Sequence, residues 1–341
     1  MTTWPHALTK DATVAVWAPS SPAPVAFPRR FARGVRALRE EGFTVRPLPS
    51  CAAADGVSTA DPAALAAELH RALEDPACDG VVAAVGGWTL INVLPYIDWQ
   101  LVGDARKPLI GYSDLTSLLN TTARRTGLVA FHGPMVISEW GEAAGAWEYT
   151  RAEFRAVTGL DGRWARRVLT DPGAWSDEML WWDKEDDRPR APRAGGERLR
   201  TVRAGVTEAE GVLWGGSLAV LSLTLGTPYA DPAPDGLVFL ESEGVAPDEF
   251  AARLAQLRQA GVFDRAVGVL VGRIGSPRPC LSGFTDYDQV LRDIVPAHLP
   301  IAAGYAFGHS TPMATVPVGA RARLLCAEGE DPRLTLLGPA A

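Results

Sequence analysis

Strand-length apolar runs alternate with helical patterns through the first half of the chain, and this alternation restricts the fold more than any other feature. The runs at 13–17 (TVAVW), 80–85 (GVVAAV) and 108–112 (PLIGY) lack the in–out alternation of half-exposed strands. Residues 30–42 and 61–74 carry apolar side chains at helical spacing. Strands buried on both faces and separated by helices form a mostly parallel sheet with helices on both sides. We therefore predict an α/β fold of the Rossmann or flavodoxin type.

The second half reads as a separate unit, a smaller α/β domain with a β-rich end. A chain of 341 residues is long enough for two domains. We predict an N-terminal domain at 1–165, a Trp-rich linker at 166–205 and a C-terminal domain at 206–341. Residues 211–230 read as a strand, a Gly-Gly turn and a helix, and the tail alternates like paired strands at 315–317 and 320–325.

Ser113 lies where the predicted strand 108–112 turns into a helix that begins near Asp114. A serine at such a turn has its hydroxyl lifted out of the sheet, and the unpaired N–H groups at the helix start can hold an oxyanion. The G-x-S-x-G signature of α/β hydrolases is incomplete, because Leu115 replaces the second glycine. Ser113 alone is therefore explained equally well as a nucleophile or as a helix cap. The helix itself shows one core-facing stripe, formed by Leu115, Leu118, Leu119 and Thr122.

Composition and charge argue against several function classes. The net charge of −7 and the absence of a Lys/Arg cluster give no support for binding nucleic acid or an anionic membrane. The chain has no bilayer-length apolar stretch and no secretion signal, so we expect a cytoplasmic protein. Its four cysteines are far apart and show neither zinc-site spacing nor a disulfide framework.

A serine nucleophile needs a base, and the base needs an orienting carboxylate. His309 follows a predicted strand and is preceded by Gly308, whereas His132 lies in the segment FHGPM. Glu241 ends an apolar strand, where a buried carboxylate requires a partner such as an imidazole. Glu243, in the next turn, is expected to be solvated. A structural role is the commoner explanation for any one of these residues, so they stay candidates.

Six short motifs occur in register along the chain. They are GG at 86–87, GYSD at 111–114, HGPM at 132–135, GGSL…GTPY at 215–229, FLE at 239–241 and GHS at 308–310. Each is weak alone. Together they resemble the LD-carboxypeptidase family of serine peptidases, which includes the microcin C immunity peptidases called MccF. The resemblance runs from APS at 18–20 to the final strands.

The resemblance implies a catalytic triad assembled from both domains. Ser113 would be the nucleophile, His309 the general base and Glu241 the residue that orients the imidazole. The backbone N–H groups of Gly87 and Asp114 would form the oxyanion hole. Neither metal nor cofactor is implied, the substrate would be a small molecule, and the protein would be a homodimer. The residues expected to contact substrate are Gly86, Trp88, Trp175, Trp181, Trp182 and Ser217.

The Trp-rich segment favours the MccF branch of the family. WSDEMLWW at 175–182 resembles the MccF substrate loop, where aromatic rings stack on a nucleobase, a contact worth roughly 1–3 kcal/mol per base. The resemblance then implies cleavage of the bond between an aminoacyl or peptidyl group and a nucleotide, which detoxifies microcin C-like compounds. These tryptophans could equally pack the insert or line a dimer interface. The alternative functions are removal of terminal D-alanine from muropeptides and, opposed by the complete triad, a catalytically silent binding protein.

Two departures from the family pattern concern the acyl group. Ser217 stands where the family commonly has Asn, and the stretch SEGVAPDEF after Glu241 lacks the basic residues often found there in MccF. The recognition of an acidic aminoacyl group is therefore in question, and the sequence leaves open which acyl group is bound.

Overall fold

Two sheets lie side by side in the computed structural model, which describes residues 2–162, 164, 166–193, 198–205 and 208–339. The first sheet has the order β12-β5-β4-β3-β1-β2. Its strands β1 to β5 are parallel, as in a flavodoxin-type sheet. The predicted α/β fold is confirmed. The strands of this sheet are β1 (Thr13–Trp17), β2 (Thr44–Pro47), β3 (Gly80–Ala83), β4 (Leu109–Gly111), β5 (Ala130–His132) and β12 (Val316–Val318).

Helices pack around this sheet much as the periodicity predicts. Asp61 caps its helix by accepting the N–H groups of Ala63 and Ala64. The helices are α1 (Ala23–Ala26), α2 (Pro28–Glu40), α3 (Pro62–Glu74), α4 (Trp99–Ala105), α5 (Thr116–Thr126) and α6 (Glu148–Thr158). Shorter turns of helix are η1 (Pro49–Ala52), η2 (Leu90–Asn92), η3 (Leu94–Tyr96), η4 (Ser113–Leu115) and η5 (Val136–Trp140).

The second sheet has the order β6-β14-β13-β8-β9-β10-β11-β7, with a parallel centre from β8 to β11. Its outer strands are antiparallel, which is the predicted β-rich end. The strands are β6 (Arg167–Leu169), β7 (Arg200–Arg203), β8 (Ala209–Ser217), β9 (Gly236–Glu241), β10 (Ala266–Gly272), β11 (Ile301–Tyr305), β13 (Arg321–Leu325) and β14 (Arg333–Leu336). The helices are α7 (Leu218–Thr224), α8 (Pro247–Gln259) and α9 (Tyr287–Ile294).

The two strands predicted in the tail belong to different sheets. β12 pairs antiparallel with β5 of the first sheet, whereas β13 pairs with β8 and β14 of the second. The chain changes sheets at Gly319, where φ is +88°. Alternation in a sequence predicts a strand but not its partner, so the predicted pairing was wrong. Because β12 returns to the first sheet between β11 and β13 of the second, the chain crosses between the two units more than once. The predicted domain boundaries stay a prediction.

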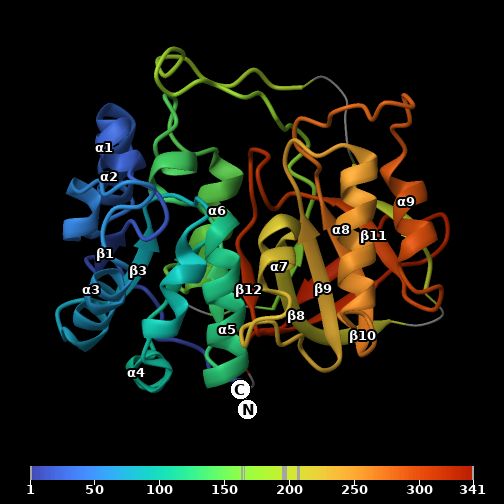
Figure 1. Ribbon diagram of the computed structural model, residues 1–341, viewed down its shortest axis with the longest axis horizontal. Coiled ribbons are helices and arrows are strands. Elements are labelled where there is room, and N and C mark those ends of the chain that lie inside the picture. Colours follow the sequence, from blue (N-terminus) through green and yellow to red (C-terminus); the bar gives the residue numbers. More distant parts are fainter. Residues whose placement is uncertain (1, 163, 165, 194–197, 206–207, 340–341) are drawn as a thin grey trace.

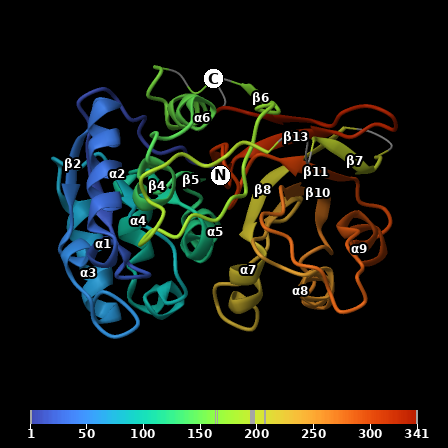
Figure 2. The ribbon, with the colours of Figure 1, turned by 90° about the horizontal axis from the view of Figure 1, so that it is seen from above.

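Helix α5 is buried on all sides over its first two turns, unlike the single stripe that the sequence indicates. It lies between the two sheets (Figure 2). Its polar residues face β8, where the Asn120 amide donates to Gly215 O at 2.8 Å and accepts from Gly215 N at 3.0 Å. Gly215 is therefore part of β8 rather than of the predicted turn, and a Cβ there would overlap the Phe239 carbonyl.

Replacing Asn120 by Ala should lower the free energy of unfolding by about 2–4 kcal/mol, because two buried backbone groups of Gly215 lose their partner. Urea denaturation measures the change. The control is Asn92→Ala on the exposed face of η2, expected to change stability by less than about 0.5 kcal/mol. Equal effects of the two substitutions would show that the Asn120 contact does not hold the units together.

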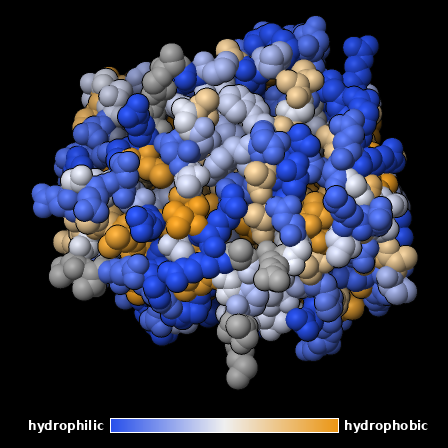
Figure 3. Space-filling model, turned by 180° about the vertical axis from the view of Figure 1, so that it is seen from behind, coloured by the Kyte–Doolittle hydropathy of each residue, from blue (hydrophilic) through white to orange (hydrophobic). Residues whose placement is uncertain are grey.

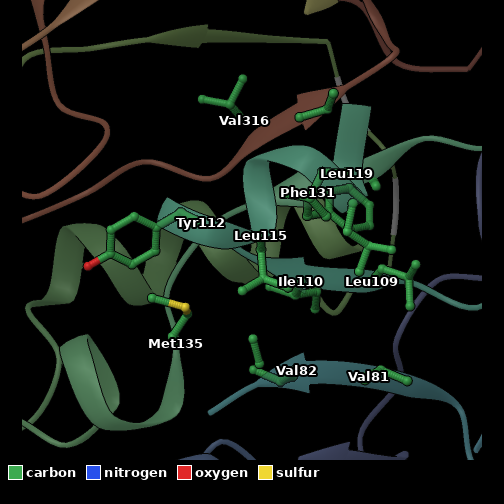
Figure 4. Packing of buried hydrophobic residues seen from close by; sticks show 14 of the residues in the cluster. Val81, Val82, Leu109, Ile110, Tyr112, Leu115, Leu119, Phe131, Met135 and Val316 are labelled. Carbon is green, nitrogen blue, oxygen red and sulfur yellow. The ribbon is translucent and has the colours of Figure 1, made fainter. Parts of the chain in front are cut away.

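Strand β4 runs through the core of the first sheet. Leu109 and Ile110 pack beside Val81 and Val82 of β3 and Phe131 of β5 (Figure 4). This packing holds the end of β4, and with it Ser113, in a fixed place. On the face seen from behind, apolar residues form small separate patches (Figure 3). No helix in the described ranges is both long and apolar enough to span a bilayer. The homodimer and the cytoplasmic location stay predictions.

Candidate active site

Ser113 leaves β4 in a strained conformation. Its φ is +58°, in the left-handed region that side chains other than Gly and Asn avoid at a cost of roughly 1–3 kcal/mol. Gly86, after β3, lies against it, and a Cβ on Gly86 would come 2.9 Å from the Ser113 Oγ. The strand–turn–helix geometry is that of a nucleophile elbow, although the second glycine is absent.

Two backbone N–H groups lie beside Ser113 without a protein acceptor. In the described part of the chain, neither the N–H of Gly87 nor that of Asp114 donates to another residue. The Asp114 carboxylate is buried and turned toward η2, where it accepts the Leu90 N–H at 3.0 Å. Burial raises the pKa of this carboxyl. Asp114 thus bonds the neighbouring turn with its side chain and, within the described ranges, its own N–H keeps the donor capacity that an oxyanion would need.

His309 joins Ser113 to Glu241. Its Nε2 lies 3.2 Å from the Ser113 Oγ, and its Nδ1 lies 2.7 Å from the Glu241 Oε2. Glu241 ends β9, and His309 follows β11, so the arrangement is drawn from both sheets. Gly308 permits it, because its φ is +95° and a Cβ there would come 2.6 Å from the Glu241 Cβ. The glycine thus permits the close approach to Glu241.

The two charged partners shift each other's pKa in opposite directions. Burial alone would raise the pKa of Glu241, but His309 more than offsets this and holds the pKa below its usual value. Burial alone would lower the pKa of His309, yet the Glu241 carboxylate, and after it Glu243, raises it to about 9. The pair therefore favours an imidazolium, which is the form that follows proton transfer from serine.

We expect activity to rise with pH through the raised pKa of His309, about 9. A general base works only when deprotonated, so a raised pKa moves the acidic limb of the profile to higher pH. The measurement is kcat/KM from about pH 6 to about pH 10, a range that lies on both sides of this pKa. An acidic limb that lies below neutral pH would contradict the raised pKa of His309.

Three residues to which the family motifs assign no role also shape this site. The Tyr112 ring meets the His309 ring edge-on at 5.0 Å, and its hydroxyl donates to the Glu139 Oε1 at 2.8 Å. Burial raises the pKa of Glu139 to about 6. Glu243 is exposed, as expected, and its Oε2 lies 3.7 Å from the His309 Nε2. Tyr112 precedes the serine and could have been suspected, whereas Glu139 in η5 carries no local signal.

His132 is not brought to Ser113. It is fully buried between Tyr112 and Phe239, with ring centroids 5.7 and 5.3 Å away. Burial lowers its pKa to about 4, so it stays neutral. Of the two candidate bases, only His309 contacts the serine. In the described ranges, no three His, Cys, Asp or Glu side chains are grouped to bind a metal ion.

The Trp-rich loop is attached to both sheets and passes over the ends of their strands (Figure 1). Ser176 exchanges backbone hydrogen bonds of 2.6 and 2.9 Å with Thr311, two residues after His309. On the other side, the Arg190 Nε donates to the Glu142 Oε1 at 2.9 Å. The loop is therefore held next to the His309 turn.

The predicted substrate tryptophans differ in exposure. Trp175 is buried between the guanidinium groups of Arg193 and Arg273, which favours the packing explanation for it. Trp182 is half-buried and packs edge-on against Phe27. Trp88 and Trp181 are 62% and 63% exposed and available to a ligand. Ser217, at the end of β8, is buried, and its N–H donates to the Thr116 Oγ1.

Comparison with known proteins places this arrangement in a family. The model of the LD-carboxypeptidase N-terminal domain matches residues 14–133, and that of the C-terminal domain matches residues 210–324. The chain belongs to the LD-carboxypeptidase family. Among LD-carboxypeptidase relatives, a Streptomyces coelicolor protein named as a carboxypeptidase is 32% identical over 349 residues, covering 98% of this chain and 96% of that one.

The microcin branch of the LD-carboxypeptidase family is also similar. The microcin C7 self-immunity protein MccF of Escherichia coli is 25% identical over 317 residues, covering 91% of this chain and 89% of that one. A solved structure of MccF with aspartyl sulfamoyl adenosine matches the fold with a TM-score of 0.88 at 23% identity, covering 98% of each chain. The family assigns the chain to the serine peptidases.

Proposed function

We propose that this peptidase acts through Ser113, His309 and Glu241. The hydrogen-bonded chain from Ser113 through His309 to Glu241 carries the proposal. Ser113 Oγ attacks the substrate carbonyl carbon while the His309 Nε2 takes its proton, and Glu241 holds the Nδ1–H. The N–H groups of Gly87 and Asp114 stabilise the oxyanion that forms.

The second half of the reaction uses the same groups. The imidazolium of His309 returns its proton to the leaving nitrogen, so the scissile bond breaks and an ester on Ser113 remains. Water then attacks this ester while the His309 Nε2 takes its proton. The imidazolium returns that proton to the Ser113 Oγ as the ester bond breaks, so the acid and the free enzyme result.

We propose an aminoacyl or peptidyl nucleotide as substrate. The support is the loop fixed beside His309, which exposes Trp181, with Trp88 exposed after Gly87. MccF, a relative, has been solved with aspartyl sulfamoyl adenosine. Exposed aromatic rings suit the face of a nucleobase. The alternative, removal of D-alanine from muropeptides, is supported by the carboxypeptidase names of the family and of the Streptomyces relative.

A direct comparison of substrates tests the proposal. The protein is incubated with alanyl sulfamoyl adenosine and with a muropeptide tetrapeptide ending in D-alanine, and products are identified by mass. We expect cleavage of the nucleotide compound. Cleavage of the tetrapeptide alone would overturn the nucleotide proposal and favour the alternative.

The exposed tryptophan provides a finer test. Trp181→Ala should raise KM for the nucleotide compound about tenfold, because loss of one stacked base costs roughly 1–3 kcal/mol. The matched control is Met179→Ala, an apolar side chain 51% exposed on the same loop. If both variants raise KM equally, the loop is acting through its packing rather than through stacking.

A further inference from the structure

Glu243 is a second carboxylate beside the nucleophile, and the proposed mechanism makes no use of it. Its Oε2 lies 3.7 Å from the His309 Nε2. That nitrogen is the one that lies 3.2 Å from the Ser113 Oγ. Glu241, by contrast, holds the opposite nitrogen of the ring. Glu243 thus lies on the same side of the imidazole as Ser113, because the His309 Nε2 contacts both the Glu243 Oε2 and the Ser113 Oγ.

The backbone fixes Glu243 in this place. Glu243 forms a parallel bridge with Gly275, which follows β10. The Gly244 N–H donates to the Gly275 carbonyl at 2.9 Å, and the Gly275 N–H donates to the Ser242 carbonyl at 3.3 Å. Glu243 therefore belongs to a turn after β9 whose backbone is hydrogen-bonded to the segment after β10. This gives its charge a defined position relative to Ser113.

The charge of Glu243 is not neutralised by an arginine or lysine. Within the described ranges, its one ion-pair contact is the His309 ring. Arg278 is paired with Glu249 at 3.5 Å, and Arg193 is paired with Asp177 at 2.9 Å. The Glu243 side chain is 34% exposed, so a ligand can reach it. A fixed, accessible carboxylate favours a cation and repels an anion.

We propose that Glu243 is the counter-ion for the free α-ammonium group of an aminoacyl substrate. One carbon atom separates this group from the reacting carbonyl, so it comes within reach of Glu243 when Ser113 attacks. A peptidyl or muropeptide acyl group, whose α-nitrogen is acylated, has no such charge. The inference rests on the proposed function and narrows it, because it selects aminoacyl over peptidyl compounds. It also agrees with the lack of basic residues directly after Glu241, since nothing there would attract an acidic acyl side chain.

A matched pair of substrates isolates this charge. Alanyl sulfamoyl adenosine carries the α-ammonium, and lactyl sulfamoyl adenosine has a neutral hydroxyl in its place. A second pair, alanyl-D-alanine and lactyl-D-alanine, differs in the same way but has no nucleotide. The ratio of kcat/KM within a pair cancels any effect of Glu243 on the basicity of His309, because both substrates use the same base.

We expect the wild-type protein to prefer the ammonium member of a pair by about tenfold at pH near 7. In Glu243→Gln the ratio should fall to about one, because the amide is uncharged. Asp248→Asn, which removes an exposed carboxylate from the first turn of α8, should keep the wild-type ratio. The same ratio in Glu243→Gln and wild type would overturn the proposal, even if both rates fall.

The two pairs also separate this inference from the function on which it rests. If only the D-alanine pair is cleaved, the nucleotide proposal fails, while the ratio within that pair still decides the role of Glu243. If the wild-type protein cleaves neither pair, both proposals fail.

Discussion

Ser113→Ala should reduce kcat by about 10⁴–10⁶-fold, with the fold preserved. The proposed nucleophile has no substitute, because the neighbouring hydroxyl of Ser117 is buried and donates to the Asp114 carbonyl. The rate is measured on alanyl sulfamoyl adenosine, and urea denaturation checks stability. The control is Ser222→Ala on α7, which removes only a bond to the Leu218 carbonyl.

The strain at Ser113 provides a second readout of the same site. Ser113→Gly should be equally inactive but more stable than Ser113→Ala by about 1 kcal/mol, because glycine accepts a positive φ at no steric cost. Residual activity within about a hundredfold of wild type in either variant would show that another residue is the nucleophile.

Glu241→Gln should reduce kcat by about 10³–10⁴-fold while His309 and Ser113 stay in place. The Gln amide can donate to the His309 Nδ1, which puts the ring proton on Nε2, where it cannot accept from serine. Loss of the buried carboxylate also removes the main cause of the raised pKa of His309. The pH at which activity appears should therefore fall below that of the wild type.

Kinetics across pH measure both effects, and urea denaturation checks that the variant is folded. Asp248→Asn, an exposed substitution on α8, serves as the control for loss of a carboxylate. A loss of less than tenfold in Glu241→Gln would mean that the carboxylate does not orient the base.

Much of the fold can be predicted from local sequence pattern. The predictions that were wrong depend on contacts between segments that are distant in the chain. The apolar runs and caps predict β1, β9 and α3 to within a residue or so, because periodicity and capping are local. The sheet to which β12 belongs depends on a contact with β5 that is distant in the chain. The burial of the polar face of α5 likewise depends on β8, so no helical stripe could predict it.

The candidate site divides in the same way. Short motifs at strand ends contain Ser113, Glu241 and His309, and the family resemblance predicts that they form one triad. The structure brings these three side chains into contact. Glu139 and Glu243 have no such signal, because their effect comes from packing against Tyr112 and His309. Trp175 reads as a ligand contact in the sequence, but Arg193 and Arg273 enclose it in the fold.

The central claim is that Ser113 carries the acyl group during turnover. Rapid quenching with alanyl sulfamoyl adenosine, followed by mass analysis of the peptides, tests it directly. We expect an added alanyl group on the peptide that contains Ser113, absent from Ser113→Ala. An adduct on a different residue, or full turnover by Ser113→Ala, would contradict the account.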